Sequence, residues 1–134
     1  MGGPMKRRGI LHADLSRELA RLGHTDRVLV GDMGLPIPRG VTVIDLAVVP
    51  GTPPFTTVLD ALLGEIVVQG HLVATESAAS PAGAWFADRA DLLGSGEAVP
   101  HEEFKARTHD VQVAIRTGEA TPYANVILEC GVPF

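Results

Sequence analysis

The chain of 134 residues has a single cysteine, few aromatic residues and no excess of basic ones. Cys130 lacks a partner for an internal disulfide and lies in an apolar run, so we expect a buried, reduced thiol. Four phenylalanines, one tryptophan and one tyrosine accompany 11 basic and 16 acidic side chains. The chain therefore lacks the groups that neutralise phosphates and stack on bases, and we expect no nucleic-acid partner.

Long apolar runs are also missing. No stretch is long enough to cross a bilayer, and no signal-peptide core follows the basic residues at 6–8. We therefore expect a cytoplasmic protein with no membrane partner. Residues 1–4 are predicted to be a flexible leader, and residues 5–134 a single domain, which is the size that one core can serve.

Apolar residues, by contrast, are abundant. They make up 46% of the sequence, which is high because one small chain can hide only part of its apolar surface from water. Self-association into a homo-oligomer is the expected way to cover the remainder.

Helical and strand patterns alternate along the chain. Asp14 is the expected N-cap of the first helix and Gly23 its left-handed stop. The alternation predicts an α/β fold, with a Rossmann-like three-layer α/β/α arrangement and a mostly parallel, mixed sheet. The expected helices are 14–23, 54–64, a segment within 80–93, and 101–118; the expected strands are 28–30, 41–47, 66–68 resuming at 72–74, 98–99, and 123–130, with a loop at 94–96.

The candidate site centres on the short strand at 28–30. His24 stands before it, just after a helix end, and Asp32 follows it, next to a loop stiffened by proline at 34–38. Open α/β sheets commonly present polar groups where strands end. Asp32 is therefore the first candidate for a ligand contact, and His24 the first for proton transfer.

Further polar groups fall at other predicted ends. The carboxyl end of a helix suits His24 to give a proton, and a helix start suits His101 to accept one. Tyr123 and Asn125 stand two apart, so on a strand both would point to one face and could bind hydroxyls. Capping or surface roles remain the alternative for each histidine, and structural hydrogen bonding for the Tyr123 and Asn125 pair.

Other chemistries find little support in the sequence. None of the five histidines forms a pair at a metal-binding spacing, so no metal is expected. The glycines around Asp32 do not form a dinucleotide fingerprint, and no phosphate-binding loop is present. No serine sits in a strand-turn-helix elbow of the hydrolase type.

Three stretches resemble a known family. LGHTDRVLVGDMGLPIP at 22–38, HEEFK at 101–105 and IRTGEATPYANVILECGVPF at 115–134 resemble the D-ribose pyranase family, a branch of the ribose pyranase and fucose mutarotase superfamily. The resemblance implies an isomerase without a cofactor that interconverts the pyranose and furanose forms of β-D-ribose. In ribose catabolism it would supply the form that ribokinase uses after uptake.

The same resemblance implies roles for individual residues. His24 falls on the family's proton donor, and the sugar-binding positions fall on Asp32, His101, Tyr123, Ala124 and Asn125. It also implies ring-shaped octamers or decamers with the site near a subunit interface. We expect His24 and Asp32 to converge on one sugar, within a subunit or between neighbours. The alternatives are a mutarotase for another monosaccharide, such as L-fucose, and a non-catalytic sugar-binding subunit.

Overall fold

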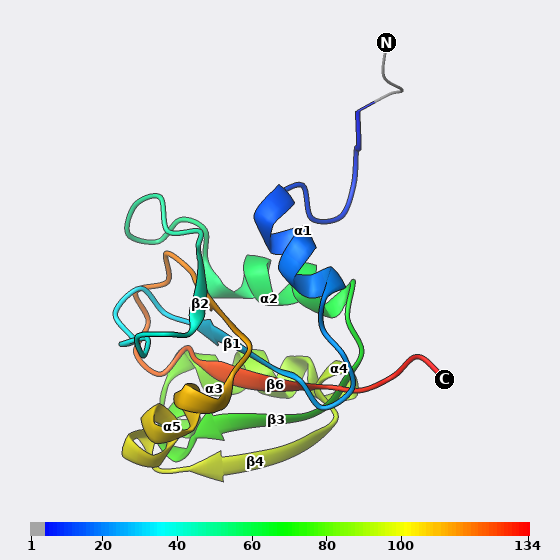
Figure 1. Cartoon of the computed structure of the whole chain (residues 1–134). Helices are drawn as coiled ribbons and strands as arrows, with labels where there is room; N and C mark the ends of the chain where they lie inside the picture. Colours follow the sequence, from blue (N-terminus) through cyan, green and yellow to red (C-terminus); the bar gives the residue numbers. More distant parts are fainter. Residues whose placement is uncertain (1–4) are drawn as a thin grey trace.

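A six-stranded sheet forms the centre of the protein within residues 5–134, which the computed structural model describes (Figure 1). The strand order is β2-β5-β1-β6-β3-β4. β5 pairs in parallel with β1 and β2, and β3 with β4, whereas β6 runs antiparallel to both β1 and β3. The predicted α/β fold with a mixed sheet is confirmed. The strands are β1 (Arg27–Gly31), β2 (Thr42–Asp45), β3 (Val68–Ala74), β4 (Ser95–Val99), β5 (Val113–Arg116) and β6 (Val126–Cys130).

Helices cover both faces of this sheet and give the expected three layers. Alternate residues of a strand point to opposite faces, so Val28 and Val30 pack with the helices of one face and Leu29 faces the other. The first face is covered by α1 to α4, and the second by α5, through the fully buried Phe104. The helices are α1 (Ala13–Ala20), α2 (Phe55–Leu63), α3 (Pro81–Asp88), α4 (Ala90–Leu93) and α5 (His101–Arg107), with short 3-10 turns at Thr75–Ala79 and Thr108–Asp110.

The first helix begins and ends differently from the prediction. Its N-cap is His12 rather than Asp14, because the His12 Nδ1 accepts a hydrogen bond of 3.1 Å from the Leu15 N–H. The helix ends at Ala20, and Gly23 is not the left-handed residue. Thr25 is, with a φ of 72°, so the turn into β1 lies later than expected.

The largest error of the sequence prediction concerns residues 101–118. The expected helix stops at Arg107, and residues 113–116 form β5, an inner strand paired on both sides. Val113 and Ile115 are 1% exposed, as befits a strand covered on both faces. The signal was present, because β-branched residues alternate at 111, 113 and 115 with the period of a strand rather than a helix.

Three other boundaries also differ. The loop expected at 94–96 contributes its last two residues to β4, and the two pieces expected at 66–74 are one strand with a register shift between Val68 and Gly70. β6 begins only at Val126, so Tyr123 and Asn125 lie in the loop before it and not on a strand. The same-face argument for them is therefore wrong, and Tyr123 has a left-handed φ of 64°.

The single cysteine is buried as predicted. Cys130 is 4% exposed, and burial, followed by the charges of Asp26 and Glu129, raises the pKa of its thiol. In the described part of the chain, none of the helices has the length and apolar character needed to cross a bilayer. The predicted leader at 1–4 lies outside the described residues.

Candidate functional site

Strand ends from both halves of the sheet meet at one edge. β3 and β4 point the same way in Figure 1 while β6 runs against them, so the start of β6 lies beside the ends of β1 and β3. Four of the predicted residues follow or precede these strand ends, and we call them the polar edge: Asp32, His101, Tyr123 and Asn125.

Asp32 and Asn125 hold each other through two hydrogen bonds. The Asp32 N–H donates to Asn125 Oδ1 at 2.8 Å, and Asn125 Nδ2 donates to Asp32 Oδ2 at 3.0 Å. The other carboxylate oxygen of Asp32 accepts from the Gly34 N–H at 2.9 Å. Asn125 is 1% exposed and Asp32 is half-buried. Each carboxylate oxygen keeps a lone pair that could accept from a ligand hydroxyl.

The loop that carries Asp32 is anchored by the segment that follows β5. The buried Thr117 hydroxyl donates to the Gly31 carbonyl at 2.8 Å, and Arg116 Nε donates to the Met33 carbonyl at 3.0 Å. The Met33 N–H in turn donates to the Glu119 carbonyl at 2.9 Å. Sequence reasoning missed these anchors because it placed residues 115–118 in a helix.

His101 and Tyr123 form an aromatic corner. Their rings meet edge to face at 5.1 Å between centroids, and the imidazole is also stacked on the Phe104 ring, with 6.4 Å between centroids. Among the described residues, His101 Nδ1 is the one buried side-chain nitrogen or oxygen without a hydrogen-bond partner. Because an unpaired buried polar atom costs free energy, this nitrogen is the reason that we keep His101 as a candidate ligand contact.

Ala124 lies between Tyr123 and Asn125 but points elsewhere. It is fully buried and packs in the apolar cluster on the α1 to α4 side of the sheet. A ligand at the polar edge therefore does not contact its side chain.

His24 lies at the opposite end of β1. It precedes the strand and Asp32 follows it, so all five residues of β1, a length of about 17 Å, lie between them. The His24 side chain is exposed, and its Nε2 forms a hydrogen bond of 3.0 Å with Gln69 Oε1. A single chain therefore does not bring His24 and Asp32 together, and they can share a ligand only across a contact between two copies.

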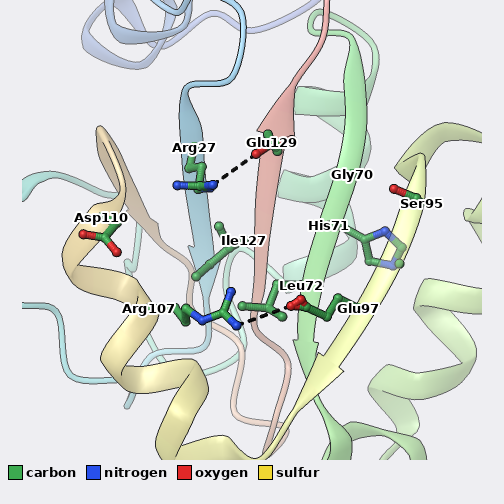
Figure 2. Close-up of a pocket in the computed structure, with 11 residues that line it drawn as sticks. Arg27, Gly70, His71, Leu72, Ser95, Glu97, Arg107, Asp110, Ile127 and Glu129 are labelled. Atoms are coloured by element: carbon green, nitrogen blue, oxygen red, sulfur yellow. Dashed lines mark hydrogen bonds and ion pairs between the residues drawn. The ribbon is translucent and has the colours of Figure 1, made fainter.

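A separate cavity of about 340 Å³ opens on the sheet face next to α5 (Figure 2). Arg27 pairs there with Glu129 at 3.2 Å and Arg107 with Glu97 at 3.4 Å. None of the predicted site residues lines this cavity. Since its arginines are already paired with carboxylates, we take the polar edge as the candidate site.

Glu119 joins the site loop to α2. Its Oε1 accepts from the Phe55 N–H at 2.9 Å, which satisfies the start of that helix, and its Oε2 accepts from the Thr121 hydroxyl at 2.8 Å. Partial burial acts to raise the pKa of Glu119, but the hydrogen bonds from Phe55, Thr121 and Ala120 together lower it below its usual value.

Replacing Glu119 should therefore make stability depend less on pH. The Phe55 and Thr121 N–H groups donate to different oxygens of Glu119, and a glutamine has only one acceptor oxygen, so Glu119→Gln should cost about 1 kcal/mol at pH 7. Because the folded-state pKa is lowered, the stabilisation is present above the unfolded pKa of about 4.3 and is lost as the pH falls through the folded value. Urea unfolding at several pH values measures the difference. The stabilities of Glu119→Gln and the wild type should become equal at low pH. Glu102→Gln, at a side chain 84% exposed, is the control, and its difference from the wild type should not change with pH in this way.

Comparison with known proteins places nearly the full length of the chain in one family. The sequence profile of the RbsD / FucU transport protein family matches residues 5–133. A D-ribose pyranase of Paracidovorax citrulli is 52% identical over 130 residues, which cover 97% of this chain and 100% of the relative. D-ribose pyranase 2 of Streptomyces griseus is 53% identical over 135 residues, with the same coverage of 97% and 100%.

Solved structures agree with these sequence matches. Bacillus subtilis RbsD, complexed with D-ribose, is 45% identical and has a TM-score of 0.88, with 97% of this chain and 100% of that chain covered. The fucose mutarotase of Streptococcus pneumoniae is 22% identical with a TM-score of 0.75, over 92% of this chain and 95% of that chain, and shares the fold. The chain belongs to the RbsD / FucU transport protein family.

Proposed function

We propose that this protein is a D-ribose pyranase, an intramolecular isomerase that interconverts the pyranose and furanose forms of β-D-ribose. The observation that carries the proposal is the polar edge, where the buried His101 Nδ1 has no hydrogen-bond partner within the described part of the chain and Tyr123 packs against the same ring. Relatives named D-ribose pyranase match 97% of the chain at about half identity, and a similar structure holds D-ribose, which supports this choice of substrate.

The reaction needs only proton transfers. Opening a cyclic hemiacetal removes a proton from the anomeric hydroxyl and delivers one to the ring oxygen, and closing through a different hydroxyl reverses both. An acceleration of about 10³ corresponds to about 4 kcal/mol, and positioned acid and base groups typically supply 10²- to 10⁴-fold.

In this scheme one residue transfers the proton and the others bind the sugar. Protonated His24 delivers the proton to the ring oxygen. Asp32 and Asn125 hold hydroxyls from one side, because their mutual hydrogen bonds lock both side chains in place. Tyr123, His101 and the main chain of Ala124 bind the sugar from the other side.

We further propose that each site forms between two subunits of a cytoplasmic ring-shaped homo-oligomer, an octamer or decamer. His24 and the polar edge lie at opposite ends of β1, so one copy would offer its His24 to the polar edge of its neighbour. Exposed apolar side chains near the outer edge of β2 support self-association, because water contact with them is unfavourable. Val48 is 75% exposed, Val49 56% and Val43 43%.

Exchange of D-ribose between its ring forms tests the proposal directly. Saturation-transfer NMR on D-ribose should show that the protein accelerates exchange between pyranose and furanose signals. L-Fucose, measured in parallel, should show a smaller acceleration. A larger effect on L-fucose would identify a mutarotase for that sugar instead, and binding of D-ribose without faster exchange would identify a non-catalytic sugar-binding subunit.

A further inference from the structure

A chain of hydrogen bonds runs from His24 along the end of the sheet that lies away from the polar edge. His24 Nε2 is 3.0 Å from Gln69 Oε1, and Gln69 Nε2 donates to Glu129 Oε2 at 2.9 Å. The other oxygen of Glu129 accepts from Arg27 at 3.2 Å, a pair that Figure 2 shows bridging β1 and β6. Three segments that are distant in sequence, at residues 24–27, 69 and 129, are thus linked to one histidine.

The donors and acceptors in this chain have a fixed direction. The Glu129 carboxylate can only accept, so the Gln69 amide must turn its NH₂ group toward Glu129. The Gln69 carbonyl then faces His24, and a carbonyl also only accepts. The proton of that last hydrogen bond must therefore sit on His24 Nε2. No hydrogen bond joins His24 Nδ1 to any group in residues 5–134.

We propose that Gln69, oriented by Glu129, holds neutral His24 as the Nε2–H tautomer, so that Nδ1 is the nitrogen that exchanges its proton with the sugar. The assignment of that proton to catalysis rests on the function proposed above, whereas the tautomer does not. Gln69 and Glu129 are positioning residues in this scheme, because they act on the sugar only through the imidazole.

The proton balance follows from this assignment. The imidazolium carries protons on both nitrogens, and it gives the Nδ1 proton to the ring oxygen as the ring opens. It is left as the neutral Nε2–H form, still bonded to Gln69. Water takes the anomeric proton as the ring opens. When the ring closes, Nδ1 takes the proton of the attacking hydroxyl and water returns a proton to the carbonyl oxygen, so His24 ends the cycle as it began and Gln69 never has to reorient.

Neighbouring backbone leaves little space around Gln69. Gly94 ends α4 with a φ of 65° and a ψ of −154°, and a Cβ at this position would collide with the Gln69 carbonyl group. On the other side, a Cβ at Gly131 would approach the Gln69 Cβ to 3.2 Å. Two glycines therefore let neighbouring backbone pack closely around the residue that we assign to hold His24.

Ring ¹⁵N chemical shifts of the histidines in the sugar-free protein test the tautomer. Spectra are recorded at about pH 8.5, well above the ordinary histidine pKa of about 6.5, and the His24 signals are those missing from His24→Ala. We expect the His24 ¹⁵N chemical shifts of a pure Nε2–H tautomer, in which Nε2 carries the proton and Nδ1 carries none. Averaged shifts of a tautomer mixture, or a protonated Nδ1, in the wild type would overturn the proposal without any variant having to fold.

Two variants extend the test to the positioning residues. Gln69→Leu removes the acceptor, and Glu129→Gln lets the Gln69 amide turn around, so both should move the His24 shifts toward a tautomer mixture. Both should also slow ribose exchange at saturating sugar by about tenfold, with the half-saturating ribose concentration unchanged. Glu97→Gln is the matched control, because Glu97 pairs with Arg107 on the same face without touching Gln69.

The two kinds of readout separate failure of this proposal from failure of the function. An inactive wild type with the Nε2–H tautomer would sink the proposed function alone. If the wild type is active but the His24 shifts in both Gln69→Leu and Glu129→Gln equal those of the wild type, only the proposed role of Gln69 and Glu129 is refuted.

Discussion

Co-expression of His24→Ala with Asp32→Asn should restore ring exchange that neither variant shows by itself. His24→Ala removes the acid, and we expect a loss of 10²- to 10⁴-fold with ribose binding retained. Asp32→Asn should also be nearly inactive. Both oxygens of Asp32 accept hydrogen bonds, from Asn125 and Gly34, and an amide can accept only one of them.

The size of the recovery follows from counting. If each site takes His24 from one copy and Asp32 from its neighbour, random 1:1 assembly makes about one quarter of the sites intact. The intact sites are those where an Asp32→Asn chain supplies the histidine and a His24→Ala chain supplies the aspartate. If both residues came from the same chain, no site would be intact. Saturation-transfer NMR on D-ribose measures the outcome.

A second mixture serves as the matched control. Wild type co-expressed with the double variant His24→Ala/Asp32→Asn should also keep about one quarter of the wild-type activity when sites are shared. Sites contained in single chains would instead keep about one half. Zero recovery in the first mixture together with one half in the second would refute the shared site.

Gly94→Ala, which adds a single methyl group, should cause the largest loss of stability among the variants that we propose. Gly94 combines a left-handed φ of 65° with a ψ of −154°, a region that is open essentially to glycine alone. The added Cβ would also overlap the Gln69 carbonyl group, which belongs to β3 and cannot swing aside as a flexible side chain could. We expect a loss of about 4 kcal/mol or more, seen as a fall of about 15 °C in Tm.

Gly40→Ala separates the two causes. Gly40 has a φ of 91°, but none of the atoms in residues 5–134 lies within 4 Å of the position of an added Cβ. The free energy of unfolding of Gly40→Ala should therefore fall only by the cost of the backbone conformation, about 1 to 2 kcal/mol. Thermal unfolding of both variants compares them. Equal losses would show that the contact with Gln69 is relaxed at no cost, and that the packing around β3 is looser than described.

The fold was predictable where local patterns agree with the final packing. Residues 28–30 and 55–63 carry clear strand and helix patterns, and both elements formed as expected. The prediction failed at β5 because only the five residues 108–112 separate it from a real helix, and helical spacing could be extended over both. What decides between the two is pairing with β1 and β2, which are far away in sequence.

The candidate site was predictable in part for the same reason. Asp32 and His101 follow strand ends, and the rule that strand ends carry polar sites found them. The antiparallel course of β6 was not foreseen, although it is what brings Asn125 to Asp32. Nor could Gln69, Glu119 or Thr117 be found, because each acts through a partner more than 40 residues away.

β6 has a consequence for how the chain can change length in evolution. Asn125 precedes its first residue and grips Asp32, while Glu129, one residue before its end, leads through Gln69 to His24. The five residues of β6 therefore set the distance between the polar edge and the His24 end of the sheet in each copy. In the proposed homo-oligomer, an insertion or deletion within β6 would change the spacing between these two ends in every copy, whereas a change of length in the helical segment at 81–93 would leave that spacing unchanged.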